Sequence, residues 1–194
     1  MKVNVLTKCA VAAAFLLVFA SYGVAQLPTS GNAFFGYSYS KLQIVSSSAF
    51  ATASGNGWQG SVEGKFLPWL GGVAELDWHY GGHLLTNCGG TGCTAALVNV
   101  NASRHDLLFG PRVSVSVQRY TPFAELLLGV THQTDSNGSQ INSDTGFAFA
   151  AGGGLDYKLV KGVAARVQID SIHHSLFGRG NNDLRIATGI VFRF

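Results

Sequence analysis

The sequence closes on Leu184-Arg185-Ile186-Ala187-Thr188-Gly189-Ile190-Val191-Phe192-Arg193-Phe194, in which residue character alternates with a period of two. Every second residue counted back from Phe194 belongs to an almost purely apolar set, whereas the intervening set contains Arg185 and Arg193. A period of two indicates a β-strand, because successive side chains of a strand point to opposite faces. A strand with one apolar and one charged face, ending on an aromatic residue, is typical of a wall between lipid and a polar lumen.

The composition limits the class of protein. A length of 194 residues is enough for one domain. The chain is 47% hydrophobic and only 12% charged, against roughly 25% charged residues in soluble domains. Its surface therefore cannot be a dense shell of charges. The net charge is only +3 and no basic patch is visible, which argues against a nucleic-acid partner.

Residues 1–25 have the organisation of a secretory signal peptide. Two early lysines precede a short apolar core at residues 9–20, and Gly23-Val24-Ala25 supplies the small residues that a signal peptidase reads. A transmembrane anchor is disfavoured, because the apolar core is shorter than the roughly 20 residues that a spanning helix needs. We expect cleavage after Ala25, which leaves residues 26–194 as one exported domain.

The alternation of the C-terminal stretch recurs along the exported chain. Eight segments show it, at residues 35–40, 58–66, 74–80, 107–117, 124–130, 147–157, 163–170 and 184–194. Short turns are expected at 67–69, 119–121 and 158–162, and long polar loops at 46–55, 81–102, 133–144 and 173–182. An even number of strands joined by alternately short and long connections predicts an all-β, eight-stranded antiparallel up-and-down transmembrane β-barrel.

The charged residues of these segments fall opposite the apolar face of their own strand. They are Glu63, Lys65, Glu75, Asp77, Arg112, Glu125, Asp156, Arg166, Asp170, Arg185 and Arg193, among residues that are mostly Ser, Gly and Ala. A charge facing lipid at the bilayer centre costs roughly 2–4 kcal/mol, so lipid contact demands this segregation. Eight strands leave a bore only wide enough for side chains, which predicts a lumen filled by paired charges. A soluble barrel is the alternative, but these few charges would then have to solubilise its whole outer wall.

Aromatic residues gather near the ends of the expected strands, as in the interfacial girdles of membrane barrels. One girdle, at the short turns, is predicted to contain Phe66, Trp69, Tyr120, Phe123, Tyr157, Phe192 and Phe194. The other is predicted to contain Trp58, Trp78, Tyr80 and Phe147.

Together with the signal and the alternation of short turns and long loops, three stretches carry a resemblance to a known family. They are Thr121-Pro122-Phe123-Ala124, residues 147–156 (FAFAAGGGLD) and the ending Gly189-Ile-Val-Phe-Arg-Phe194. Over about residues 30–194 the chain resembles the outer-membrane β-barrel domain family, which includes the transmembrane domain of outer membrane protein A and the opacity-type surface proteins. The resemblance implies insertion into the lipid of a Gram-negative outer membrane. It also implies that the barrel assembly machinery reads the strand ending on Ile190, Phe192 and Phe194, and it implies no catalytic chemistry and no cofactor.

Two groups of residues in the expected loops are candidates for chemistry. Cys88 and Cys93 form an even pair in an exported chain, which favours a disulfide over a metal site. Five histidines fall at loop ends, where a metal or pH-sensitive site is the alternative to solvated side chains: His83, His105, His132, His173 and His174. His173 and Ser175 share a face, as in a His-x-Ser hydrolase pair, but such a pair needs an orienting carboxylate. The nearest downstream acid, Asp183, is expected to point inward.

The sequence therefore favours a structural or surface-binding barrel whose long loops meet an unidentified extracellular ligand. A porin-like channel for small solutes and a lipid hydrolase are the alternatives. An open aqueous channel usually needs roughly sixteen strands, which argues against a large pore in a barrel of this size.

Overall fold

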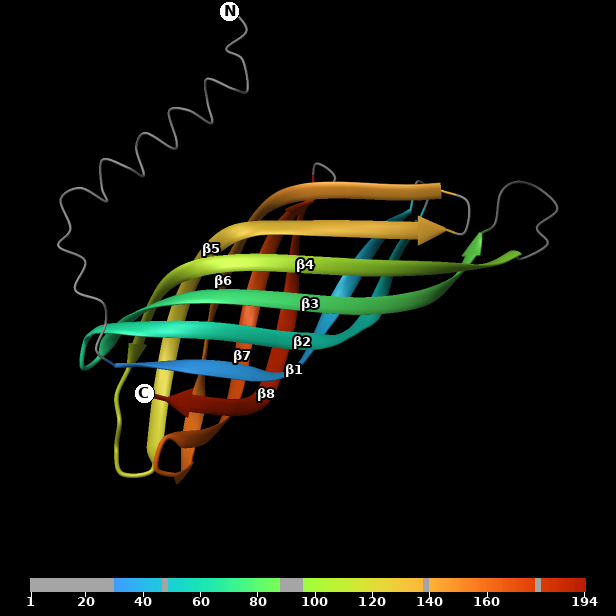
Figure 1. Ribbon diagram of the computed structural model, residues 1–194. Coiled ribbons are helices and arrows are strands. Elements are labelled where there is room, and N and C mark those ends of the chain that lie inside the picture. Colours follow the sequence, from blue (N-terminus) through green and yellow to red (C-terminus); the bar gives the residue numbers. More distant parts are fainter. Residues whose placement is uncertain (1–29, 47–48, 88–95, 138–139, 177–178) are drawn as a thin grey trace, which may run out of the picture.

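Eight antiparallel strands close into a barrel in the computed structural model, which describes residues 30–46, 49–87, 96–137, 140–176 and 179–194. Each strand pairs with its neighbours in sequence, and the last strand pairs with the first (Figure 1). The strands are β1 Gly31–Ser46, β2 Ala49–Leu67, β3 Leu70–Asn87, β4 Ala96–Ser114, β5 Tyr120–Asn137, β6 Gln140–Val160, β7 Val163–Leu176 and β8 Arg179–Arg193. The prediction of an eight-stranded up-and-down barrel is confirmed.

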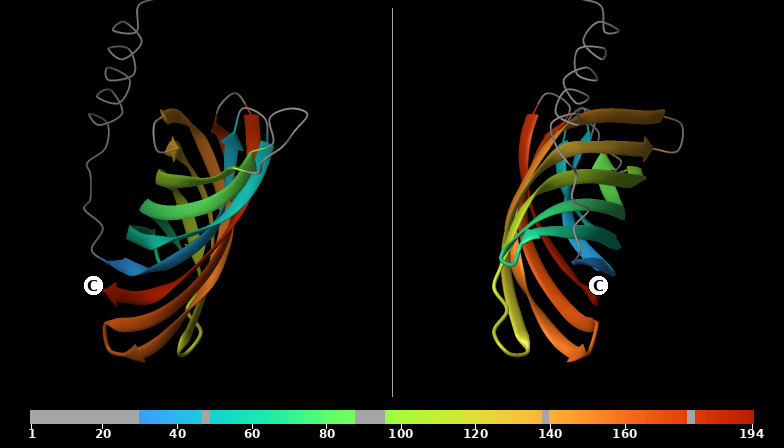
Figure 2. Two further views of the ribbon diagram at one scale, coloured as in Figure 1. Left: turned by 90° about the vertical axis from the view of Figure 1, so that its right-hand side faces the viewer. Right: turned by 60° about the vertical axis from the view of Figure 1, so that its left-hand side comes forward.

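The C-terminal strand closes the barrel against β1. The backbones of Gly31 and Phe194 exchange hydrogen bonds of 2.9 and 3.1 Å, and further along Gly36 lies opposite Gly189. A Cβ atom on Gly189 would collide with the backbone of Phe35 and Gly36, so the close approach of the two strands requires glycine here. The C-terminus accordingly lies beside the start of β1 (Figure 2).

Three short connections lie at the end of the barrel that also holds Gly31 and Phe194; we call this the turn end. They join β2 to β3 at residues 68–69, β4 to β5 at 115–119, and β6 to β7 at 161–162. Gly162 has a φ of 81°, a left-handed conformation that glycine adopts without a steric penalty. The predicted positions of all three turns overlap these connections, although β4 ends earlier than expected.

The strands reach much further toward the opposite end than predicted. Residues expected in long loops instead continue the pairing, as between β3 and β4 out to Asn87 and Ala96. The prediction of loops at 46–55, 81–102, 133–144 and 173–182 is therefore wrong for most of those residues. It failed because small and polar residues are frequent in these segments, so hydropathy does not alternate regularly although the hydrogen-bond ladder continues. In Figure 1, β3 to β6 extend side by side at this end. The predicted disulfide residues Cys88 and Cys93 lie outside the described residues.

The wall has an apolar outer face and a buried, largely polar inner face. Large apolar side chains stay exposed on the outside of the strands, for example Leu126, Leu128 and Val130 on β5, each about half exposed at 52%, 52% and 50%. The alternate residues, such as Glu125 and Leu127, are buried inside. Among the described residues, none lies in a helix long and apolar enough to cross a membrane.

Candidate functional site

The lumen gathers nearly all the acidic side chains of the chain. Every Asp and Glu except Asp144 is buried on the inner face of the wall. Of the residues predicted to point inward, nine are buried: Glu63, Glu75, Asp77, Arg112, Glu125, Asp156, Arg166, Asp170 and Arg185. The other two, Lys65 and Arg193, lie at the turn end of the lumen and are partly exposed. The strands thus bring all the predicted charges into one interior space.

The centre of the lumen is organised around Arg185 of β8. Its Nη2 lies 2.6 Å from Oε1 of Glu75 and 2.6 Å from Oδ2 of Asp170, and its Nη1 pairs with Asp77. These carboxylates reach it from β3 and β7, so one guanidinium ties three strands together. Arg185 is fully buried, and its removal would leave three carboxylates in a space that water does not reach.

Two glutamines donate hydrogen bonds from uncharged amide groups to the central acids. Gln168 Nε2 donates to Glu125 Oε1 at 2.6 Å and to Asp170 Oδ2 at 2.9 Å. Gln59 Nε2 donates to Glu75 Oε2 at 2.5 Å. Both amides are fully buried, and neither was singled out from the sequence because an isolated glutamine carries no charge pattern. They partly compensate for the shortage of cations in this layer.

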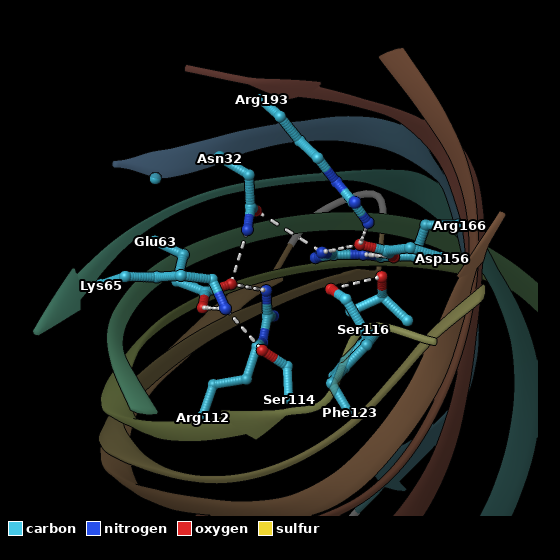
Figure 3. A pocket seen from close by; sticks show the side chains of 12 residues that line it. Asn32, Glu63, Lys65, Arg112, Ser114, Ser116, Phe123, Asp156, Arg166 and Arg193 are labelled. Carbon is cyan, nitrogen blue, oxygen red and sulfur yellow. Dashed lines mark hydrogen bonds and ion pairs between the residues drawn. The ribbon is translucent and has the colours of Figure 1, made fainter. Parts of the chain in front are cut away.

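The turn end of the lumen holds a second, more basic cluster (Figure 3). Arg112 bridges Glu63, at 3.3 Å, and Glu125, at 2.6 Å. Arg166 makes a two-pronged pair with Asp156, at 2.6 and 3.0 Å. The partly exposed cations complete the cluster: Arg193 lies 3.2 Å from the same aspartate, and Lys65 donates to Ser114 Oγ at 2.6 Å and lies 3.6 Å from Glu63.

Phe123 is part of this cluster and not of the aromatic girdle, so its predicted position is wrong. Its side chain is only 7% exposed and points into the lumen. The guanidinium carbons of Arg112 and Arg166 each lie 4.5 Å from the centre of its ring. The negative faces of an aromatic ring attract cations, so one ring can hold two guanidinium groups in place. The prediction relied on the position of Phe123 near the turn. Strand parity would have placed its side chain inside, because Phe123 is two residues from the inward Glu125.

A third cluster lies near the opposite end; the inward orientation of Asp183 is confirmed, but Arg104, Asp106 and His174 were not expected inside. Arg104 lies 3.2 Å from Asp106 and 2.5 Å from Asp183, and it donates to Ser40 Oγ at 2.9 Å. His174 Nε2 approaches Asp183 at 3.4 Å. These residues fall in or beside segments predicted as loops. Extending the parity of Arg112 back along β4 would have placed Arg104 and Asp106 inside.

The lumen also contains a layer of apolar side chains, contrary to the expectation of a face made of charges and small residues. Its buried members are Val73, Leu108, Leu127, Ala148, Ala150 and Ile172. Phe34, Ala164, Ala187 and Val191 form a second such group. These side chains fill space between the polar clusters, as in other small barrels whose interior is packed.

The predicted loop histidines are distributed over strands. His105, His132 and His173 lie on the outer face, His174 points inward, and the side chain of His83 lies outside the described part. His173 Nδ1 hydrogen bonds Asn182 Oδ1 at 2.7 Å, so an amide and not a carboxylate orients the His-x-Ser pair. Over the described ranges, no group of three potential His, Cys, Asp or Glu ligands is placed to hold a metal ion.

On β5, one acid lies beyond the outward apolar residues, which end at Val130. Asp135, near the opposite end of β5, accepts a hydrogen bond of 3.0 Å from Gln133 Nε2. Burial raises the pKa of its carboxyl above the ordinary value, and the hydrogen bond acts in the other direction. This acid belongs to the lumen lining although it lies in a segment predicted as loop.

Comparison with solved structures places the fold among small outer-membrane barrels. The attachment invasion locus protein Ail of Yersinia pestis is similar over 85% of this chain and 98% of that chain, with 13% identity and a TM-score of 0.56. The same protein in complex with the heparin analogue sucrose octasulfate is similar over 84% of this chain and 99% of that chain, with 14% identity and a TM-score of 0.55. Neisserial surface protein A is similar over 85% of this chain and 96% of that chain, with 11% identity and a TM-score of 0.56. This likeness is in fold: all are small β-barrels of the outer-membrane type, as the resemblance implied. Neither the protein-family models nor the curated proteins gave a match.

Proposed function

We propose that this chain is an integral outer-membrane barrel that is structural or binds at the cell surface, with a lumen closed by its own side chains. Residues 1–25 would direct export and be removed after Ala25. Outer-membrane lipid would surround the wall. The turn end, with its short connections, would face the periplasm, and the long strand ends would project outward.

The apolar outer face is the observation that carries this proposal. The outward residues of successive strands form a continuous apolar surface, including Leu107 and Phe109 of β4 and Val167 and Ile169 of β7. A soluble domain of this size would expose a patch of only a few hundred Å². Where the structure describes side-chain exposure, charged residues on this surface lie toward its ends, for example Lys41, Arg119 and Lys161. Lipid is the solvent that suits such a wall.

The interior favours a closed barrel over a channel. Four buried arginines lie at intervals along the lumen, and each is paired with carboxylates from other strands. Apolar layers fill the space between them. Eight strands leave an interior that side chains can fill. The lumen would therefore stabilise the barrel without passing solutes at a high rate.

The last strand would also serve as the signal for insertion. Ile190, Phe192 and Phe194 share the outward face at the end of β8, and all are exposed. They therefore remain available to the barrel assembly machinery before the barrel closes. Pairing of β8 with β1 closes the barrel and leaves no free strand edge.

A hollow near the opposite end supports a surface-binding role. It has a volume of about 400 Å³ and lies across β3, β4 and β5. Tyr80, Asn101, Ser103, Thr134 and Ser136 line it, so it offers one aromatic face and several hydroxyl or amide groups. One similar barrel has been solved with a sulfated sugar analogue. We propose that an extracellular ligand is bound at this end.

Two measurements on the purified protein test the proposal. The first is extraction from membranes in detergent followed by electrophoresis of heated and unheated samples, where a folded barrel shifts its mobility on heating. The second is conductance in planar bilayers, where we expect no steady, large channel. Recovery as a soluble periplasmic protein without detergent would overturn the membrane location, and a steady, large conductance would support the porin alternative instead.

A further inference from the structure

The turn end of the lumen encloses a small polar cavity. Its volume is about 60 Å³, and its lining comes from most of the barrel strands (Figure 3). Arg112 and Arg166 are buried at its inner side, whereas Lys65 and Arg193 are 22% and 30% exposed at its rim. The cavity therefore opens toward the end of the barrel and is separated from the lipid side by the wall.

The lining of this cavity is basic, unlike the rest of the lumen. Four cations line it, against two lining carboxylates, Glu63 and Asp156, and a third carboxylate, Glu125, that pairs with Arg112 from outside the lining. In the central layer the balance is reversed, because Arg185 faces Glu75, Asp77 and Asp170. Charges in a confined space of low dielectric are costly unless they are balanced. The excess of positive charge at the turn end therefore favours a negatively charged ligand.

One buried donor in the cavity has no partner in the described protein. Asp156 takes Nε and Nη2 of Arg166, but Nη1 of this guanidinium is buried without a hydrogen bond. Buried N–H groups are almost always paired, so an isolated one indicates a ligand or a solvent molecule. At the rim, Lys65 Nζ donates to Ser114 Oγ at 2.6 Å and to Pro68 O at 3.5 Å and lies 3.6 Å from Glu63, and its charge lies at the mouth of the cavity.

The donors are held in position before any ligand arrives. Phe123 lies between Arg112 and Arg166 and fixes both guanidinium groups through contacts to its ring. Asp156 and Glu125 fix the other edges of the same groups. A fixed set of donors binds more tightly than a mobile one, because less side-chain freedom is lost on binding.

We propose that this cavity binds a small tetrahedral oxyanion, such as inorganic phosphate or sulfate. Arginine and lysine donors converging from several strands suit the oxygens of such an anion. The volume exceeds the roughly 10–15 Å³ that one water needs but excludes a large organic ligand. Of the carboxylates that share the lining, Asp156 pairs with Arg166 through both oxygens. Glu63 accepts from Asn32 and Arg112 at Oε2, whereas its Oε1 has only Lys65 nearby in the described part of the chain, at 3.6 Å. The inference depends on the proposed membrane topology only for the compartment, the periplasm, from which the anion enters.

Calorimetric titration of inorganic phosphate into the detergent-solubilised, full-length barrel tests this site, with sodium chloride at equal ionic strength as the blank. We expect saturable binding of one phosphate per chain, and competition by sulfate. Lys65→Gln keeps a donor toward Ser114 but removes the charge, and should weaken binding about tenfold, the usual effect of losing one charge-assisted hydrogen bond. Arg193→Gln, the other rim variant, should act in the same direction.

Lys161→Gln is the matched control. Lys161 is exposed in the β6–β7 turn at the same end of the barrel and does not line the cavity. It should change the affinity by less than about twofold, because exposed charges are screened by salt. Heat uptake that does not saturate, or equal weakening by Lys161→Gln and Lys65→Gln, would overturn the site. Neither result would affect the proposal that the chain is a membrane barrel.

The phosphate group of a lipid headgroup is the other candidate ligand with this chemistry. Adding phosphatidylglycerol to the detergent micelles should leave phosphate binding unchanged, because the cavity lies inside the wall. Displacement of inorganic phosphate by the lipid would overturn the assignment to a free anion. It would instead assign the cavity to a lipid headgroup that reaches over the rim.

Discussion

The two faces of β7 differ in both exposure and polarity. Val167 and Ile169 point outward and are 53% and 51% exposed, whereas the intervening Arg166, Gln168 and Asp170 are almost completely buried. A soluble protein has the opposite arrangement. The comparison teaches that burial alone does not identify the chemistry of a barrel interior, because the buried side chains here are polar and the exposed ones apolar. We therefore expect different kinds of substitution to destabilise the barrel on its two faces.

The inner face should be the more sensitive one. Replacing Arg185 by Gln leaves Glu75, Asp77 and Asp170 without their shared cation. Breaking a buried ion pair costs about 3–5 kcal/mol, so Arg185→Gln should lower the free energy of unfolding by about that amount. Reversible urea unfolding in lipid vesicles measures it. Arg119→Gln, at an exposed turn, is the control and should stay within about 0.5 kcal/mol of the wild type. Equal, small effects of both changes would show that the lumen charges are solvated.

The outer face should tolerate polar changes only outside the lipid. Ile169→Arg places a charge in the middle of the apolar band and should cost roughly 2–4 kcal/mol. Ile141→Arg makes the same change on the outward face of β6 near the opposite end, where the side chain is 74% exposed, and should cost almost nothing. The yield of heat-modifiable protein in the outer membrane reports both. If the two variants insert equally well, the proposed lipid band is wrong.

The smallest difference concerns two phenylalanines on opposite faces. Phe123→Leu removes the ring between Arg112 and Arg166 and should lower the free energy of unfolding by about 1–2 kcal/mol, as expected for desolvated cation–π contacts. Phe149→Leu, on the outer face of β6, exchanges one apolar side chain for another against lipid and should have a smaller effect. The comparison uses the same urea titration. A larger effect at Phe149 would contradict a structural role for the stacked arginines.

The sequence predicted the fold because apolar and polar residues alternate along the middle of each strand. In β8 the outward Ile186, Ile190 and Phe192 identify the apolar outer face without reference to any other strand. The prediction lost this signal toward the opposite end, where outward residues such as Ser103, Thr134 and Ser136 are polar as well. Arg104 and Asp106 were missed for that reason, although they continue the inward parity of Arg112.

Other features depend on packing across the barrel and leave little trace in one strand. The grouping of Arg185 with Glu75 depends on which strands face each other over the lumen, so sequence alone placed both residues inside without pairing them. The same limit applies to Phe123, whose partners come from β4 and β7. The disulfide between Cys88 and Cys93 stays a prediction, since both residues lie outside the described part of the chain.

The most direct test of the lipid-facing wall is the accessibility of spin labels along the outward residues of β7. Labels would be attached to single cysteines at Ala165, Val167, Ile169, Ser171 and His173, in protein whose native cysteines are replaced by serine, after reconstitution into bilayers. The ratio of collision rates with oxygen and with a water-soluble nickel complex should peak near Val167 and Ile169 and fall toward His173. A ratio that stays low at all five positions would mean that water covers this face, and would contradict a barrel that spans the membrane.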